Sequence, residues 1–99
     1  MKLSENIAAP RYVLGVCKMG GYTAWDYYNL GVACSVGQGD IELDLVQAHK
    51  WFNLAVMAGM REAHEDRAFI AAEMTGAEIA EAQRQARAWL AQGSLPQAA

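Results

Sequence analysis

Residues 28–63 read YNLGVACSVGQGDIELDLVQAHKWFNLAVMAGMREA, and this stretch decides the fold. On both sides of the break at residues 37–39, apolar residues recur every three or four positions, which is the period of a helix buried on one face. From Trp25 to Gln92 no stretch alternates apolar and polar residues as a half-buried strand would. The sequence therefore predicts an all-α fold built on an antiparallel helix hairpin.

The first helix of the hairpin is predicted to end near Gly37, where Gly37-Gln38-Gly39 breaks the pattern. Its buried stripe follows the spacing i, i+3, i+4, i+7 and consists of Tyr27, Leu30, Gly31 and Cys34.

The second helix is predicted to begin around Asp44, because a carboxylate suits an N-cap, and to end with Gly59 as its C-terminal cap. Small residues on the two helices allow their backbones to approach closely, with large rings filling the remaining space. The small residues are Gly31, Ala48, Ala55 and Ala58, and the rings are those of Trp51 and Phe52.

Two further helices are expected after the hairpin. The third spans roughly Glu62 to Met74, and Thr75 with Glu78 then matches a capping box that opens the fourth. Gly93 and Pro96 are predicted to stop the fourth helix. Its apolar stripe is Ile79, Ala82, Ala86, Trp89 and Leu90.

Before the hairpin, a helix is expected from Ile7 to Val16 with Pro10 in its first turn, followed by a turn at Gly20-Gly21. Pro10 and Arg11 interrupt what a signal peptide would need, and no run reaches the roughly 18 apolar residues of a membrane span. The expectation is a cytoplasmic protein without membrane contact.

The hairpin resembles the Sel-one-like repeat family, relatives of the tetratricopeptide repeats. The positions that match the family pattern are Leu30-Gly31, Gly37-Gln38-Gly39, Asp44, Ala48, Trp51-Phe52, Ala55, Gly59 and Ala63. Three features depart from it: Asp40 replaces a usual Val, Cys34 replaces a common Tyr, and residues 39–48 are one residue longer than usual.

The resemblance implies a short stacked α/α superhelix of antiparallel hairpins that serves as an adaptor or scaffold. It divides one domain into an N-terminal capping segment (1–23), the repeat (24–63), a C-terminal helix pair (64–93) and a tail (94–99). The helix pair resembles the cap that follows such repeats in small bacterial members. The family's concave face would be lined by the first helix of the hairpin, making Trp25, Tyr28, Asn29 and Val32 the candidate partner-binding residues, although a role in the core or as a cap is the more common explanation for aromatic residues there.

Charge argues against nucleic acid as a partner. The formal net charge is −3, and nucleic-acid affinity depends on clustered Lys and Arg. Arg84 and Arg87, three positions apart among acidic and amide residues, are interpreted as a solvated helix face.

No motif predicts an enzyme, a metal site or a cofactor. His49 and His64 lack zinc-ligand spacing, and residues 40–51 start like a calcium loop but have Leu45 and Trp51 where Gly and Glu are needed. Cys17 and Cys34 are interpreted as reduced and buried. A small hydrolase using one of these cysteines is the most distant alternative.

Two hypotheses of function remain ahead of it. The leading one is a protein-protein interaction module that offers a groove to a protein or peptide. The second is a self-assembling structural unit, because an isolated repeat cannot bury both of its faces.

Overall fold

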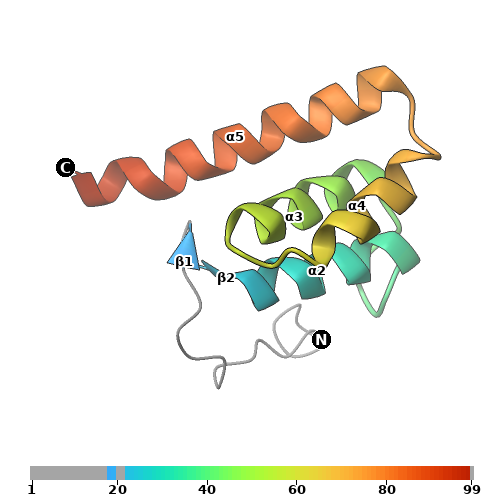
Figure 1. Ribbon diagram of the computed structural model, residues 1–99, viewed down its shortest axis with the longest axis horizontal. Coiled ribbons are helices and arrows are strands. Elements are labelled where there is room, and N and C mark those ends of the chain that lie inside the picture. Colours follow the sequence, from blue (N-terminus) through green and yellow to red (C-terminus); the bar gives the residue numbers. More distant parts are fainter. Residues whose placement is uncertain (1–17, 20–21, 99) are drawn as a thin grey trace.

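Helices account for most of residues 18–19 and 22–98, which are the residues that the computed structural model describes (Figure 1). The helices are α2 (Ala24–Val36), α3 (Leu45–Met57), α4 (Ala63–Ala71) and α5 (Gly76–Ala98). Two short strands, β1 (Lys18–Met19) and β2 (Tyr22–Thr23), pair antiparallel before α2. The all-α prediction is confirmed.

Side-chain caps fix the start of three helices. Asp44 accepts a hydrogen bond from the Gln47 N–H (3.1 Å) and begins α3, as predicted. The predicted capping box before α5 is also present, because the Thr75 N–H donates to Glu78 (2.9 Å) and the Glu78 N–H donates to Thr75 (3.1 Å). A second box, Thr23 with Asp26, begins α2 in the same way.

Glycines in the left-handed region end both helices of the hairpin. Gly37 has φ of 72° directly after α2, and the Gln38 N–H donates to the Ala33 carbonyl (3.0 Å). After α3, Gly59 has φ of 115°, and the Met60 N–H donates back to the Ala55 carbonyl (2.9 Å). Both glycines therefore close their helices where the sequence predicted.

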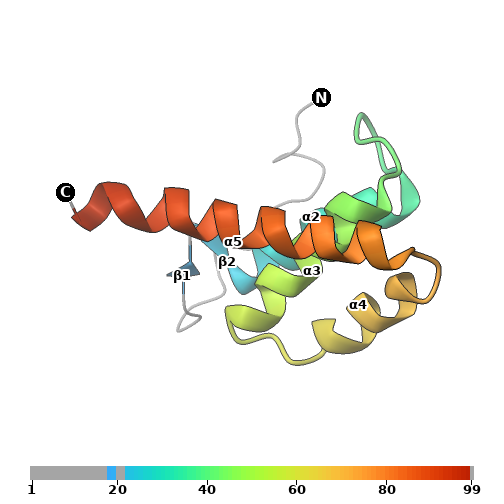
Figure 2. The same cartoon turned by 90° about the horizontal axis from the view of Figure 1, so that it is seen from above.

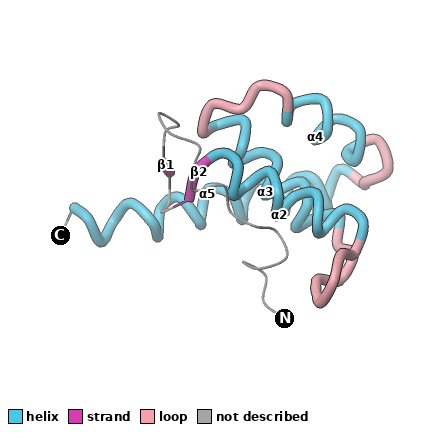
Figure 3. Tube along the Cα trace, turned by 90° about the horizontal axis from the view of Figure 1, so that it is seen from below, coloured by secondary structure: helices cyan, strands magenta, loops and turns pink. Residues whose placement is uncertain are grey.

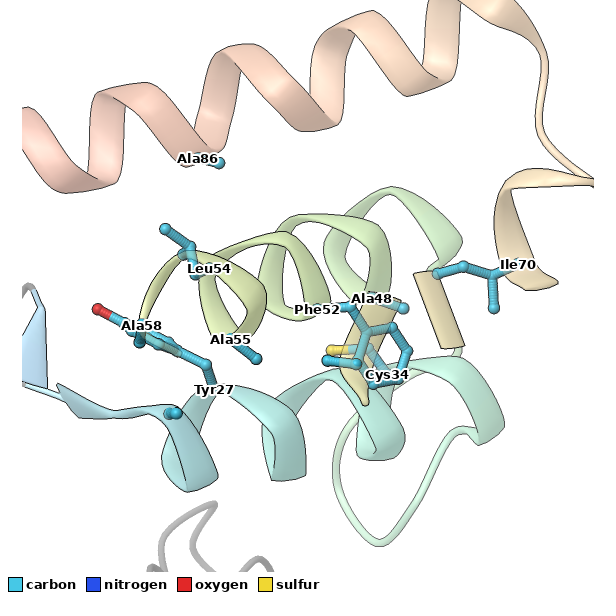
Figure 4. Packing of buried hydrophobic residues seen from close by; sticks show 11 residues of the cluster. Tyr27, Cys34, Ala48, Phe52, Leu54, Ala55, Ala58, Ile70 and Ala86 are labelled. Atoms are coloured by element: carbon cyan, nitrogen blue, oxygen red, sulfur yellow. The ribbon is translucent and has the colours of Figure 1, made fainter. Parts of the chain in front are cut away.

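Helix α3 is the centre of the fold and contacts α2, α4 and α5. Figures 1 and 2 show α5 running along the side of α3 that faces away from α2. In Figure 4, Leu54 points from α3 toward Ala86 of α5. Phe52, Cys34 and Ile70 lie nearer to the loop that joins α2 and α3. One continuous core thus runs through all the helices.

The predicted close approach between α2 and α3 occurs at Gly31. A Cβ built there would lie 2.6 Å from Cδ1 of Phe52, a side chain that is only 2% exposed, so the ring rests directly on the α2 backbone. The other residues of the repeat pattern are also structural. Leu30, Ala48, Ala55 and Ala63 are buried, Trp51 is half-buried, and Gly39 has φ of 63°.

Two predicted helix ends were wrong. Helix α4 ends at Ala71 and not at Met74, because the Glu73 and Met74 N–H groups bond three residues back, to Ile70 and Ala71, in tighter turns. Helix α5 continues past Gly93 and Pro96 to Ala98. Gly and Pro lower helix propensity by about 1 and 3 kcal/mol, but both tolerate helical dihedral angles, so neither must end a helix.

The strands were not predicted, because two residues are too few to show an alternation. Lys18 pairs with Thr23 and Met19 with Tyr22. Figure 3 shows this small ladder beside the start of α2. The helix expected at Ile7 to Val16, the turn expected at Gly20-Gly21 and Cys17 lie outside the described residues.

Candidate binding groove

A groove of about 410 Å³ runs between α2 and α4, and α3 forms its floor. Its lining is mostly apolar and contains two carboxylates. The lining residues are Tyr28, Val32, Ser35 and Val36 from α2, Leu45 and Phe52 from α3, and Asp66, Phe69, Ile70 and Glu73 from α4 and the turn that follows it.

The α2 wall is a helical stripe at spacing i, i+4, i+7, i+8, from Tyr28 to Val36. The Tyr28 ring contacts Phe52 on the floor, with centroids 5.5 Å apart. The hydroxyl of Ser35 donates to the Val32 carbonyl (2.8 Å), so it is already satisfied within its own helix. This wall therefore presents mainly apolar surface.

The α4 wall follows the spacing i, i+3, i+4, i+7, with a carboxylate at each end and two apolar residues between them. Ile70 is 6% exposed and anchors the wall to the core, whereas Phe69 is 74% exposed. A large ring this exposed gains little from folding, and exposed apolar surface beside a groove is typical of binding sites.

Tyr28 and Asp66 connect the two walls. Burial raises the pKa of Tyr28. The negative charge of Asp66 raises this pKa further, and so does the hydrogen bond that the Tyr28 hydroxyl donates to the Asp66 carboxylate. The phenol is therefore neutral at physiological pH, and the groove keeps the negative charge of Asp66 next to it.

The four candidate partner-binding residues divide between the groove and its edge. Tyr28 and Val32 line the groove, and Trp25, 41% exposed, packs edge-on against Tyr28 at 6.0 Å. Asn29 is half-buried and is absent from the lining. The α2 face chosen from the sequence thus contributes one wall.

The other wall was missed. Residues 64–93 were interpreted as a cap, and Asp66, which lies in the first turn of α4, was not among the candidate binding residues. The signal was the spacing of Asp66, Phe69, Ile70 and Glu73, which places all four on one face of a helix.

The opposite side of the hairpin is closed by an aromatic cluster, defined as Tyr22, Tyr27, Trp51 and Trp89. Tyr22 stacks on the fully buried Tyr27 at 5.4 Å, and Trp51 stacks on Tyr27 at 5.9 Å. The indole N–H of Trp89 on α5 donates to the Tyr27 hydroxyl (3.0 Å). Rings from β2, α2, α3 and α5 thus meet in one cluster.

Lys50 caps this aromatic cluster. Its Nζ lies 4.2 Å from the Trp51 ring centroid and 5.7 Å from that of Trp89, so the cation is held against two indole faces. Burial lowers the pKa of Lys50, while the neighbouring Cys34 and Asp44 act in the opposite direction.

Cys34 and His49 are both buried. Burial, and to a lesser degree the charge of Asp44, raises the pKa of Cys34 to about 11, the opposite of what a thiolate nucleophile requires. His49 is 4% exposed, and its Nδ1 has no hydrogen-bond partner among the described residues. In the part of the chain that the structure describes, no three His, Cys, Asp or Glu residues are placed to hold a metal ion.

Comparisons with family models, with curated proteins and with solved structures found no match for this chain. Among the described helices, none combines the length and the apolar character needed to cross a bilayer. The groove is therefore the feature of this chain that bears most directly on its function.

Proposed function

We propose that this protein is a protein-protein interaction module, an adaptor or scaffold without catalytic activity, built on a helical repeat of the Sel-one-like type. The observation that carries the proposal is the groove between α2 and α4, which is open and mostly apolar. Its volume falls within the range of ligand pockets, about 300 to 1,000 Å³.

The distribution of aromatic residues supports this function. Trp25, Tyr28 and Phe69 lie in or beside the groove, and aromatic side chains are over-represented among the residues that dominate binding energy. The α2–α3 hairpin that forms most of the groove also carries the resemblance to the repeat family. Among the described residues, α4 and α5 both pack against α3, an arrangement suited to an α/α superhelix.

Affinity capture with matched variants tests the proposal. Proteins that bind specifically should be retained by the wild type and by Arg87→Ala, on the exposed face of α5, but lost with Tyr28→Ala. We expect Tyr28→Ala to weaken the interaction at least tenfold, as for a hot-spot residue. The far-UV circular dichroism of both variants should match that of the wild type. Binding that Tyr28→Ala leaves unchanged would show that this face is wrong.

Self-assembly is the second candidate, and the 74% exposure of Phe69 favours it. A second copy of the chain could cover this ring as well as a foreign partner could. Size-exclusion chromatography with light scattering over a wide concentration range separates the two functions. A steady mass of 10.8 kDa leaves the groove free for another protein, whereas a dimer that Phe69→Ser dissociates would make self-assembly the function.

A further inference from the structure

We propose that the groove selects a peptide segment in which an apolar side chain lies between two basic residues. This inference rests on the proposed function and adds the chemistry of the partner. It follows from the charges in the groove, from their spacing and from the apolar surface between them.

The groove is negatively charged. Of the residues that the structure describes, those lining the groove include Asp66 and Glu73 but no Lys, Arg or His. Among the residues that the structure describes, neither carboxylate lies within ion-pairing distance of a cation. Arg67, the nearest cation along the chain to Asp66, donates instead to the Asn53 side chain on α3. The groove thus offers two carboxylates that a basic partner can pair with.

The two carboxylates bracket the apolar part of the α4 wall. They are seven residues apart, with Phe69 and Ile70 between them, and the rises of α4 and of the tighter turn after it give a separation along the chain of about 11 to 12 Å. In an extended peptide every second side chain lies on the same face, and four residues span about 13 Å. Basic residues at positions 1 and 5, with an apolar residue at position 3, therefore match the groove within the reach of their flexible side chains.

The apolar residue would contact Phe52 and Ile70, which are nearly buried, and the exposed ring of Phe69. A hydrophobic anchor supplies affinity, because it removes apolar surface of both partners from water. The carboxylates supply selectivity, because an acidic segment would meet like charges in a partly desolvated site.

Three short fluorescein-labelled peptides test the inference by fluorescence anisotropy. The first has the pattern Lys-x-Phe-x-Lys, the second has Glu in place of both Lys, and the third has Gly in place of Phe. We expect measurable binding of the first peptide alone. Raising the ionic strength from about 0.01 M to about 0.15 M, which shortens the Debye length from about 30 to about 8 Å, should weaken it.

A charge-matched pair of variants tests whether the groove is responsible. Asp66→Asn with Glu73→Gln should weaken binding of the Lys peptide about fivefold, as expected for two partly exposed ion pairs. Glu62→Gln with Glu65→Gln removes the same charge from exposed positions at and before the start of α4 that do not line the groove, and should leave binding within twofold. Thermal melts should show both proteins folded.

Equal losses in the two double variants, or equal binding of the Glu peptide, would overturn the inference. A selection from a random peptide library then separates this failure from that of the proposed function. Neutral or acidic peptides that bind the wild type but not Tyr28→Ala would refute the basic partner and retain the interaction module. If no selected peptide depends on Tyr28, the groove is not a binding site and both proposals fail.

Discussion

Trp51 and Phe52 are neighbours on α3, yet they face two different sides of the hairpin, of which one is covered by other elements and the other is open. Trp51 lies in the aromatic cluster, where rings from β2, α2 and α5 cover one another. Phe52 lies on the floor of the groove, where α2 and α4 stand apart and leave about 410 Å³ between them.

The two sides differ because different helices pack against α3 on each of them. The side at Trp51 has a third layer, because α5 runs along α3 and places Trp89 against Tyr27. The side at Phe52 ends in α4, a helix of nine residues whose buried side chains are Ala63 and Ile70. A repeat can be stabilised on one side and left open on the other, and the open side is the one that remains for a partner.

Removing a ring from each side should give the largest contrast. Trp89→Ala deletes ring contacts and the hydrogen bond to Tyr27, and we expect it to lower the free energy of unfolding by about 3 kcal/mol. Trp25→Ala, beside the groove, removes a ring that is 41% exposed and should cost less, about 1 to 2 kcal/mol. Urea unfolding followed by circular dichroism measures both. Equal losses would mean that the groove side is as important to stability as the aromatic cluster.

A smaller effect is expected where the groove floor meets α2. Gly31→Ala places a methyl group 2.6 Å from Cδ1 of the buried Phe52 ring, so overpacking near the upper end of its usual range, about 2 to 3 kcal/mol, exceeds the gain in helix propensity of about 1 kcal/mol. We therefore expect a net destabilisation of about 1 to 2 kcal/mol. Gly76→Ala, in the first turn of α5, is the matched control and should be neutral or stabilising, because no other element of the described chain comes within 4 Å of the added methyl. If Gly31→Ala is equally neutral, the contact between Phe52 and the α2 backbone is not close.

The sequence was sufficient for the hairpin because its signals are local. A carboxylate at Asp44, glycines at Gly37 and Gly59, and a capping box at Thr75 each act within a few residues of the chain. The close approach at Gly31 was also predictable, because the missing side chain and the ring that replaces it lie in adjacent helices of one hairpin.

The groove was only half predictable, because its second wall depends on how α4 packs against α3. The spacing of Asp66, Phe69, Ile70 and Glu73 gives a helix face, but the neighbour of that face is a tertiary property. The aromatic cluster was missed for the same reason: Tyr22 and Trp89 are far apart in the sequence. The continuation of α5 beyond Pro96 shows that propensity alone does not end a helix.

Acidification should weaken stability through His49, which is buried on α3 and whose Nδ1 lacks a hydrogen-bond partner in the described part of the chain. Burial, and then the positive charge of Arg67 on α4, lowers its pKa below the usual 6.5. As the pH falls through about 6.5, His49 binds a proton in the unfolded chain but stays neutral in the folded chain. The free energy of unfolding therefore decreases, with a slope of at most about 1.4 kcal/mol per pH unit. Above that pH both states are neutral and His49 contributes no pH dependence.

His49→Gln isolates this contribution, because an amide keeps polar atoms at the site and does not titrate. Urea unfolding at pH values between 7.5 and 5.5 should show stability falling in the wild type and a flatter profile in the variant. Parallel profiles would assign the acid sensitivity to other groups. A flatter profile would assign the sensitivity to His49, because its burial on α3, and then the positive charge of Arg67 on α4, opposes its protonation in the folded chain.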